Sequence, residues 1–389
     1  MHETSDMTAR LKGDWLFPTR IRFGAGRLAE LAEVCGGFGI ARPLVVTDRV
    51  LATTALAARV LEAAAKDELA PRVFAGVQEN PTDVNVAAGV ADFRDGQCDG
   101  VIALGGGSAL DCGKTIALLA GCGGPLWRFA WPDHEAAQGD RGAYPIVAIP
   151  TTAGTGAEVE PSAIVTDSSI PAKRAILHPA MMPRAVIADP ELTVSLPARL
   201  TAATGMDALS HCLEALCVSS FHPMADAIAA SGIATVAKWL PVAVAEPANL
   251  EARAAMMAAA IMGATAFGKG LGAMHALSHA IGALHGHHHG LTNAVLMPYV
   301  LTFNRPAIEP AMVLIAGTLR LPGEPFSAVR AWIVDLRRRI GIPETLTDLG
   351  VAGADFRSIA ALAASDICAG MNPVPLDASA LEGILQSAA

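Results

Sequence analysis

The chain has 389 residues, of which 52% are apolar, and it carries a formal net charge of −9. This length is enough for two domains with full cores, and the acidic balance argues against nucleic acid as a partner, because phosphate backbones bind basic surfaces. The seven cysteines include no C-x-x-C pair, which argues against a disulfide framework and favours reduced thiols in a cytoplasmic protein.

The N-terminal segment is polar and mixed in charge, unlike a signal peptide. The longest apolar runs are rich in alanine and are interrupted by Gly, Lys or Thr. We therefore predict no membrane span and no membrane partner.

The first half of the chain alternates between strand and helix patterns. Apolar runs rich in β-branched residues predict strands at 42–47, 71–77, 100–104, 145–149 and 185–188. Helical spacing predicts helices at 51–66, 83–94 and 109–121, and 158–167 can pair with 173–177 as a hairpin. Strands that alternate with helices at this spacing indicate a parallel sheet with right-handed crossovers.

The pattern changes after Asp189 and Pro190. From about 197 to the end the apolar residues follow a helical period, and alanine, leucine and methionine dominate. We therefore predict an α/β domain with a parallel sheet over 1–190 and an all-helical domain over 191–389.

A glycine turn follows the strand predicted at 100–104. Gly105, Gly106 and Gly107 let the backbone approach a phosphate, and the following helix offers unpaired amides and a positive dipole end. Ser108 is placed to cap that helix. The spacing is not G-x-G-x-x-G, and a tight turn without a ligand is the alternative interpretation.

A second turn, which contains Thr151, Thr152 and Thr155 together with Gly154 and Gly156, follows the strand predicted at 145–149. Two such turns after parallel strands favour a nucleotide, since ligands of open α/β sheets bind at the carboxyl ends of the strands. Asp48 ends the strand at 42–47, where a carboxylate can accept hydrogen bonds from a ribose and exclude the 2′-phosphate of NADP. Asp48 can equally cap a helix, and the neighbouring Arg49 leaves NADP open.

Acidic and histidine side chains recur in the apolar second half. Asp207 and His211 are four residues apart, as are His275 and His279, and His289 follows ten residues later. Residues at i and i+4 share one face of a helix, and buried charges need a partner or a metal. This N/O set suits Fe(II) or Zn(II). Hydrogen-bonded core histidines are the alternative, and three further histidines compete with His289 as a ligand: His285, His287 and His288.

Several motifs together resemble the iron-containing (group III) alcohol dehydrogenase family: GGGSALDCGK, IPTTAGTGAEV, GMDALSHCLEA and HALSHAIG followed by HHG. The resemblance covers nearly the whole chain and implies a dehydroquinate synthase-like architecture, with a nucleotide-binding α/β domain and a helical metal-binding domain. It implies metal ligation by Asp207, His211, His275 and His289. It also implies NAD binding by Asp48, Gly105, Gly106, Gly107, Ser108, Thr151, Thr152, Thr155 and Lys173.

The resemblance further implies an NAD(P)-linked oxidoreductase that acts on a small alcohol or aldehyde with Fe(II) or Zn(II) and forms a homodimer or a higher homo-oligomer. His279 is the expected proton relay, or a residue that orients a ligand. Lys269 either binds an anionic substrate group or is a solvent-exposed lysine. Glycerol-dehydrogenase-like polyol oxidation, a non-redox lyase on the same fold and a metal-storage protein are the alternative functions.

Overall fold

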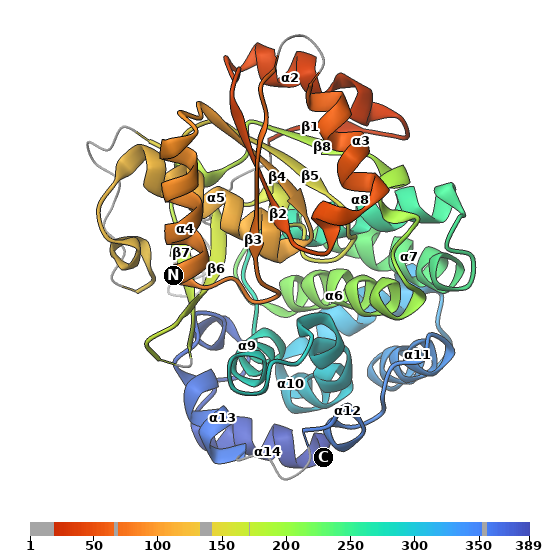
Figure 1. Ribbon diagram of the computed structural model, residues 1–389. Helices are drawn as coiled ribbons and strands as arrows, with labels where there is room; N and C mark the ends of the chain where they lie inside the picture. The colour runs from red at the N-terminus through yellow and green to blue at the C-terminus, as the bar shows by residue number, and fades with distance from the viewer. Residues whose placement is uncertain (1–18, 66–68, 133–141, 171, 352–355) are drawn as a thin grey trace, which may run out of the picture. The chain divides into compact units, whose positions relative to one another are not determined.

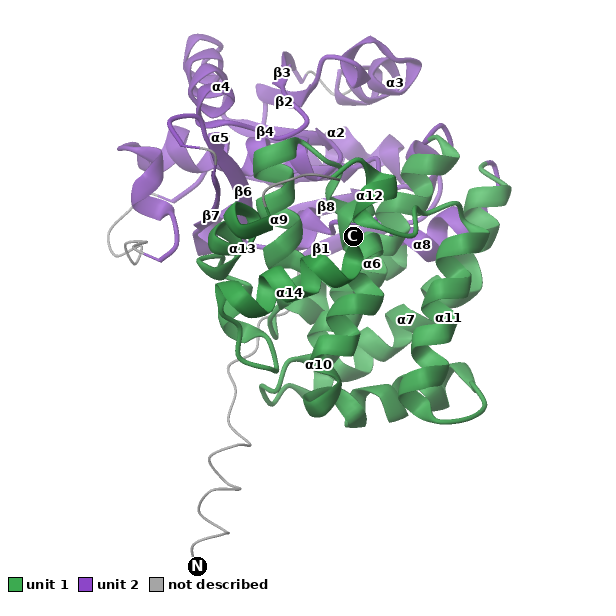
Figure 2. Cartoon of the chain, turned by 90° about the horizontal axis from the view of Figure 1, so that it is seen from below, with its two compact units in different colours: residues 1–17, 197–247, 258–389 green, residues 18–196, 248–257 purple. Residues whose placement is uncertain are grey.

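The computed structural model describes residues 19–65, 69–132, 142–170, 172–351 and 356–389. The chain divides into two compact units, an α/β unit made of 18–196 with 248–257, and a helical unit made of the remaining residues (Figure 2). The division falls between Leu196 and Pro197. Residues 1–18 of the predicted first domain lie outside the described part of the chain.

The α/β unit contains a six-stranded sheet in the order β1-β8-β5-β4-β2-β3, in which every neighbouring pair is parallel (Figure 1). The strands are β1 (Arg20–Phe23), β2 (Pro43–Asp48), β3 (Arg72–Val77), β4 (Gly100–Gly105), β5 (Ile146–Pro150) and β8 (Ala185–Ala188). The predicted parallel sheet is confirmed, and edge strand β1 is an addition that the sequence pattern did not reveal.

Helices cover both faces of this sheet, as the continuous apolar character of its strands requires. Ile102 and Leu104 of β4 belong to a buried cluster with Leu31 and Val60, whereas Ala103, which points to the other face, lies against Gly113. The four helices concerned are α2 (Leu31–Gly37), α3 (Ala55–Ala64), α4 (Asp83–Asp95) and α5 (Gly107–Cys122).

The predicted hairpin is present as β6 (Ser162–Asp167) and β7 (Ala172–Leu177), which pair antiparallel. A buried lysine of α5 attaches it to the sheet. Lys114 Nζ donates to the Ala157 carbonyl at 2.7 Å and to the Ser162 carbonyl, and it lies 3.1 Å from Asp111 Oδ1. Because the Lys114 side chain is only 1% exposed, these oxygens replace its hydration and join α5 to the hairpin.

The helical unit confirms the prediction of an all-helical second half. Its helices are α6 (Ala198–Cys217), α7 (Pro223–Ala245), the second half of α8 (Leu250–Phe267), α9 (Ala273–His285), α10 (His289–Leu319), α11 (Pro325–Arg339), α12 (Leu346–Leu349), α13 (Phe356–Ala364) and α14 (Ala378–Ala388). Helix α6 is buried continuously from Thr201 to Cys217. Within the helical unit, α6 packs against α7 and α10.

Two helices, α7 and α8, are long and apolar enough to cross a membrane by length and composition. In each helix the criterion is met by an apolar stretch of 18 residues. Of this stretch, 33% is buried within the protein in α7 and 50% in α8. Core helices of globular proteins meet the same criterion, so the expectation of no membrane span stays a prediction.

Candidate functional site

Helix α6 places three polar side chains along one buried face. Asp207, His211 and Glu214 follow one another at spacings of four and three residues, which align on one side of a helix, and they are 2%, 4% and 4% exposed. Gly290, next to His289, lets the start of α10 approach this helix closely. A Cβ atom at Gly290 would lie 2.3 Å from the Ala203 carbonyl oxygen of α6.

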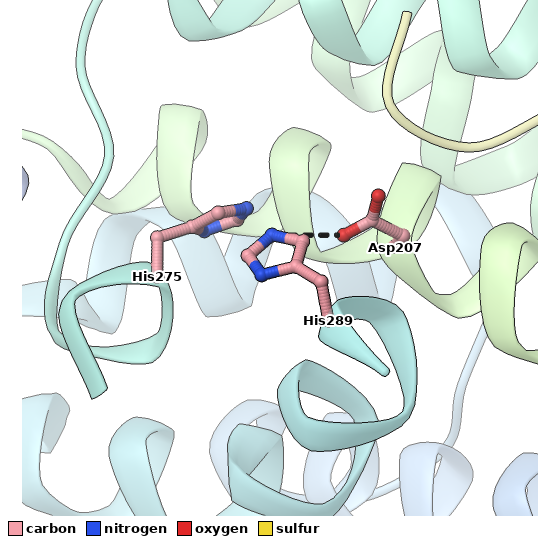
Figure 3. Close-up of side chains that lie close together, drawn as sticks. All are labelled: Asp207, His275 and His289. Atoms are coloured by element: carbon pink, nitrogen blue, oxygen red, sulfur yellow. Dashed lines mark ion pairs between the residues drawn. The ribbon is translucent and has the colours of Figure 1, made fainter. Parts of the chain in front are cut away.

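Three of the four predicted metal ligands converge (Figure 3). The ligand atoms of Asp207, His275 and His289 all lie within 4.8 Å of one another, and His289 Nε2 is 3.6 Å from Asp207 Oδ1. The His211 ring stacks on the His275 ring at a centroid distance of 4.7 Å and an interplanar angle of 19°. Helices α6, α9 and α10 therefore bring three of the predicted ligands together, and His211 lies beside them through its stacked ring.

Hydrogen bonds assign the same tautomer to both imidazoles. His275 Nδ1 lies 2.6 Å from Glu214 Oε2, so its proton is at Nδ1 and its Nε2 has a free lone pair. His289 Nδ1 lies 2.8 Å from Ser278 Oγ, whose own proton is donated to the His289 carbonyl at 3.1 Å. That hydroxyl oxygen therefore accepts from Nδ1–H, and His289 also presents a lone pair at Nε2.

The contacts of the Asn293 side-chain amide show whether these lone pairs suit a cation. Its Nδ2 lies 2.9 Å from Asp207 Oδ1, 3.1 Å from His289 Nε2 and 3.3 Å from His275 Nε2. One amide nitrogen carries only two protons, so acceptors outnumber the protons that they face. Asn293 Oδ1 is buried without a hydrogen-bond partner among the described residues. This surplus of buried N and O acceptors fits a divalent ion.

The electrostatics of the site favour positive charge. Burial lowers the pKa of His275, but the hydrogen bond and charge of Glu214 and the charges of Asp207 and Asp366 outweigh burial and raise that pKa overall. A divalent ion would benefit from the same carboxylates. Burial raises the pKa of the thiol of Cys212, the residue after His211, to about 12.

His279, the predicted proton relay, lies beside the metal ligands. Its ring stacks on His289 at 5.2 Å with an interplanar angle of 17°. Its Nδ1 is 2.9 Å from Asp366 Oδ2, while Asp366 Oδ1 accepts from the Cys368 amide at 2.8 Å. Burial raises the pKa of Asp366, but the charge and hydrogen bond of His279 and the bonds from Cys368 lower it overall. This carboxylate therefore orients His279 and leaves its Nε2 for proton transfer.

The two glycine turns of the α/β unit pack against each other at the carboxyl ends of β4 and β5. The Thr151 amide donates to the Gly105 carbonyl at 3.0 Å. A Cβ atom at Gly107 would lie 2.8 Å from Thr155 Cγ2, and one at Gly106 would lie 3.3 Å from the Thr152 side chain. Gly105 has φ +144°, which favours glycine. The sheet order reverses between β2 and β4, where open α/β sheets bind ligands.

Two residues near these turns have local roles. Ser108 does not cap α5 as predicted, because the helix begins earlier, with Gly106 at the N-cap; instead its hydroxyl donates to the Glu79 carbonyl. Asp48 is not a helix N-cap, because Val50 precedes the short 3-10 helix Leu51–Thr53 and Thr54 caps α3; its Oδ1 instead accepts from the amides of Val50 and Leu51, both at 2.8 Å.

The resemblance implied that Lys173 reaches the cofactor, whereas Lys269 had two interpretations, a contact with a substrate anion or a solvent-exposed lysine. Lys173 lies on β7 opposite Thr166. The hairpin that carries Lys173 belongs to the same unit as the two glycine turns. Lys269 Nζ lies 2.6 Å from Asp226 Oδ1, and its side chain is 4% exposed. The interpretation of Lys269 as a solvent-exposed lysine is therefore wrong, and its ammonium group is paired with the Asp226 carboxylate.

Sequence reasoning missed the residues that support the ligands: Glu214, Ser278, Asn293 and Asp366. A faint signal exists for two of them. Glu214 is an acid in the otherwise apolar segment that carries His211, and Asn293 follows His289 by one helical turn. The partner of Asp366 is 87 residues away, and no local pattern identifies it.

Comparison with known proteins shows which family the chain resembles over its length. The family model "Iron-containing alcohol dehydrogenase" matches residues 18–190, and its C-terminal counterpart matches 201–389. The 4-hydroxybutyrate dehydrogenase of Cupriavidus necator is 38% identical over 95% of this chain and 97% of its own length. The structure of a 1,3-propanediol oxidoreductase superposes with a TM-score of 0.93 at 35% identity, covering 97% of this chain and all (100%) of the other.

A sulfoacetaldehyde reductase from Bifidobacterium kashiwanohense, solved with NAD+, gives a TM-score of 0.87 at 30% identity over 97% of this chain and 98% of the other. These matches confirm the predicted fold, the enzyme class of nicotinamide-linked alcohol oxidoreductases, and the use of NAD with iron or a similar metal. The chain belongs to the iron-containing alcohol dehydrogenase family.

Proposed function

We propose that this enzyme transfers hydride reversibly between NAD and a short-chain primary alcohol or its aldehyde. Its metal ligands are Asp207, His211, His275 and His289. The observation that carries the proposal is the convergence of one carboxylate oxygen and two Nε2 lone pairs on a single buried point. A divalent ion held there supplies a Lewis acid for the substrate oxygen.

His279 is the proposed proton carrier. Asp366 holds its Nδ1–H at 2.9 Å, so Nε2 exchanges the alcohol proton while the nearby carboxylate stabilises the imidazolium. The His279 side chain is 13% exposed, which leaves access for a proton and restricts water.

The proposed dinucleotide site consists of the paired turns at Gly105–Ser108 and Thr151–Thr155, with Lys173 at the ribose end. The amides of Gly107 and its neighbours at the start of α5 face the pyrophosphate. Asp48 Oδ1 already accepts from the backbone amides of Val50 and Leu51, so Oδ2 serves the ribose hydroxyls. A carboxylate at this position disfavours a 2′-phosphate, and we therefore propose NAD over NADP.

The relatives narrow the substrate class. Their names point to 4-hydroxybutyrate, 1,3-propanediol and sulfoacetaldehyde, which are all short chains with a polar group at the far end. Since Lys269 is paired with Asp226, we propose that the preferred substrate is neutral, such as a hydroxyaldehyde or a short aldehyde.

The test is consumption of NADH by the purified protein reconstituted with Fe(II) or with Zn(II). Propanal, 3-hydroxypropanal and succinic semialdehyde provide a plain, a hydroxylated and an anionic substrate of similar length. Turnover that requires metal, with the neutral aldehydes preferred, is the expected result. No NADH oxidation with any aldehyde and either metal would refute the proposal.

We also propose a cytoplasmic homodimer. All seven cysteines are free thiols, as expected in a reducing compartment. Val313 and Leu314 of α10 are 53% and 44% exposed, and adjacent exposed apolar residues suit a subunit contact. Light scattering on the purified protein measures the mass directly.

A further inference from the structure

Glu214 makes three short polar contacts with the start of α9. Its Oε2 accepts from the Gly272 amide at 3.0 Å and lies 2.6 Å from His275 Nδ1, and its Oε1 accepts from the Met274 amide at 2.7 Å. The Glu214 side chain is 5% exposed. These donors therefore replace the water that a carboxylate otherwise keeps, and the positive end of the α9 dipole adds to their effect.

We propose that Glu214 is the positioning residue of the metal centre. By accepting a hydrogen bond from Nδ1, it keeps the proton of His275 away from Nε2, which is the atom that faces Asp207 and His289. Glu214 also lies three residues after His211, so one side chain fixes the register of α9 against the face of α6 that carries two ligands. This inference rests on the proposed function, because it concerns the metal set that this function uses.

His275 and His289 differ in the group that holds Nδ1. His289 Nδ1 is held by the neutral hydroxyl of Ser278, whereas His275 Nδ1 is held by a carboxylate. A carboxylate at the distal nitrogen makes an imidazole more basic and strengthens its bond to a metal. His275 is thus the imidazole whose affinity for the ion depends on an ionic partner.

The backbone at Gly272 is shaped for this contact. A Cβ atom there would lie 2.6 Å from Asn372 Oδ1 and 3.2 Å from Glu214 Oε1. Any larger residue would push these two acceptors away from α9. The glycine therefore admits the carboxylate to the helix start.

A simple helix cap is the competing explanation, and Asn372 provides the matched control. Its Oδ1 accepts from the Ala273 amide of α9 at 3.1 Å and from Asn304 at 2.9 Å, and its Nδ2 donates to Asn304 and to the Val374 carbonyl. Asn372→Ala therefore removes a cap from the same helix end without removing a hydrogen-bond partner of an imidazole.

The experiment compares the metal affinity of the full-length protein with that of Glu214→Gln and Asn372→Ala. Each protein is stripped of metal and titrated with Zn(II) against a chromophoric chelator, and the visible spectrum of the Co(II) form is recorded. The glutamine is neutral and its amide group cannot accept from His275 and both backbone amides. In Glu214→Gln we expect the Kd for Zn(II) to rise about 10–100-fold and the Co(II) bands to shift. In Asn372→Ala we expect an unchanged Kd and unchanged Co(II) bands, with only the Tm of the metal-free protein lowered.

An unchanged Zn(II) affinity in Glu214→Gln, or an equal loss in both variants with unchanged Co(II) bands, would overturn the proposal and leave Glu214 as a cap. If Glu214→Gln does not fold, Glu214→Asp replaces it. This shorter carboxylate keeps the charge but cannot reach all three donors, so an intermediate Kd is expected and an unaltered one refutes the role. Unaltered protein that binds neither Zn(II) nor Co(II) would instead refute the proposed function itself, and the role of Glu214 with it.

Discussion

Glu158→Gln is expected to stabilise the protein above neutral pH and to leave its stability almost unchanged in acid. Glu158 lies in the short 3-10 helix Ala157–Val159, directly after the second glycine turn, and is 2% exposed. Burial raises the pKa of its carboxyl from 4.5 to about 7, although a backbone hydrogen bond and the charge of Lys114 oppose this. Below pH 4.5 the carboxyl is protonated in both the folded and the unfolded chain, so the folded state incurs no cost.

The free-energy cost of burying the Glu158 carboxylate grows as the pH rises from about 4.5 to about 7. The unfolded chain releases its proton from about pH 4.5 upward while the folded chain retains it to about pH 7, so stability falls and then levels off. A tenfold difference in proton affinity is worth about 1.4 kcal/mol, and the full difference is therefore roughly 3 kcal/mol above pH 7. Glutamine has no proton to lose and avoids this cost.

The assay is thermal unfolding at pH 5 and pH 8. A gain of this size raises the Tm by roughly 5–10 °C at pH 8, since each kcal/mol shifts a domain of about 200 residues by about 2–4 °C. Glu33→Gln is the matched control, because the Glu33 side chain is 73% exposed and its neutralisation relieves no burial. An equal gain at both pH values, or none at pH 8, would contradict the reasoning.

Three further predictions concern the proposed site. Gly107→Ala should weaken NADH binding by about 1–3 kcal/mol in a fluorescence titration, because the new methyl group would lie 2.8 Å from Thr155 Cγ2. Adding Thr155→Ser to Gly107→Ala should restore part of the NADH affinity, and no recovery would argue against the packing of the two turns against each other. Asp366→Asn should lower kcat at least about tenfold with NADH affinity unchanged, since the amide no longer orients His279; an unchanged kcat would exclude that role. Lys269→Ala should destabilise the protein by about 1–3 kcal/mol and lower kcat/KM on neutral and anionic aldehydes by the same factor, and a selective loss on the anionic aldehyde would revive Lys269 as a substrate contact.

The central strands were predictable from the sequence because each is a buried apolar run ended by a glycine, a proline or an aspartate. Strand β4 ends at Gly105 and β5 at Pro150, where the pattern predicted turns. Strand β1 was not predictable, because two of its four residues are arginines. It is a strand only because it pairs with β8, more than 160 residues later in the sequence.

The start of α5 shows how backbone geometry escapes a residue-type argument. Serine is a good N-cap, and Ser108 stands where a cap was expected. Gly106 has φ −80° and ψ −173°, so the extended residue that precedes the helix is the glycine, and the serine is already helical. Its hydroxyl then reaches the Glu79 carbonyl rather than an amide of its own helix.

The ligands and their supports differ in how far the sequence reveals them. Asp207 and His211 are potential metal ligands one helical turn apart in an apolar segment, and so are His275 and His279. Each pair is therefore visible in the local sequence. Glu214 is a single acid whose three donors lie 58 to 61 residues away. A support of this kind becomes visible only when the packing of α6 against α9 is known.

The charges of the site explain why the sequence pattern of the ligands and their geometry in the structure both favour a divalent metal ion. Asp207 and Glu214 bring two formal negative charges into a region where their side chains are 3% and 5% exposed. A proton on His275 balances only one of them, which accounts for the raised pKa of that imidazole. A divalent ion balances both, and it therefore stabilises two carboxylates that are buried beside unprotonated Nε2 atoms. The same charge count predicts that the metal-free protein gains most from Zn(II) where both carboxylates are intact.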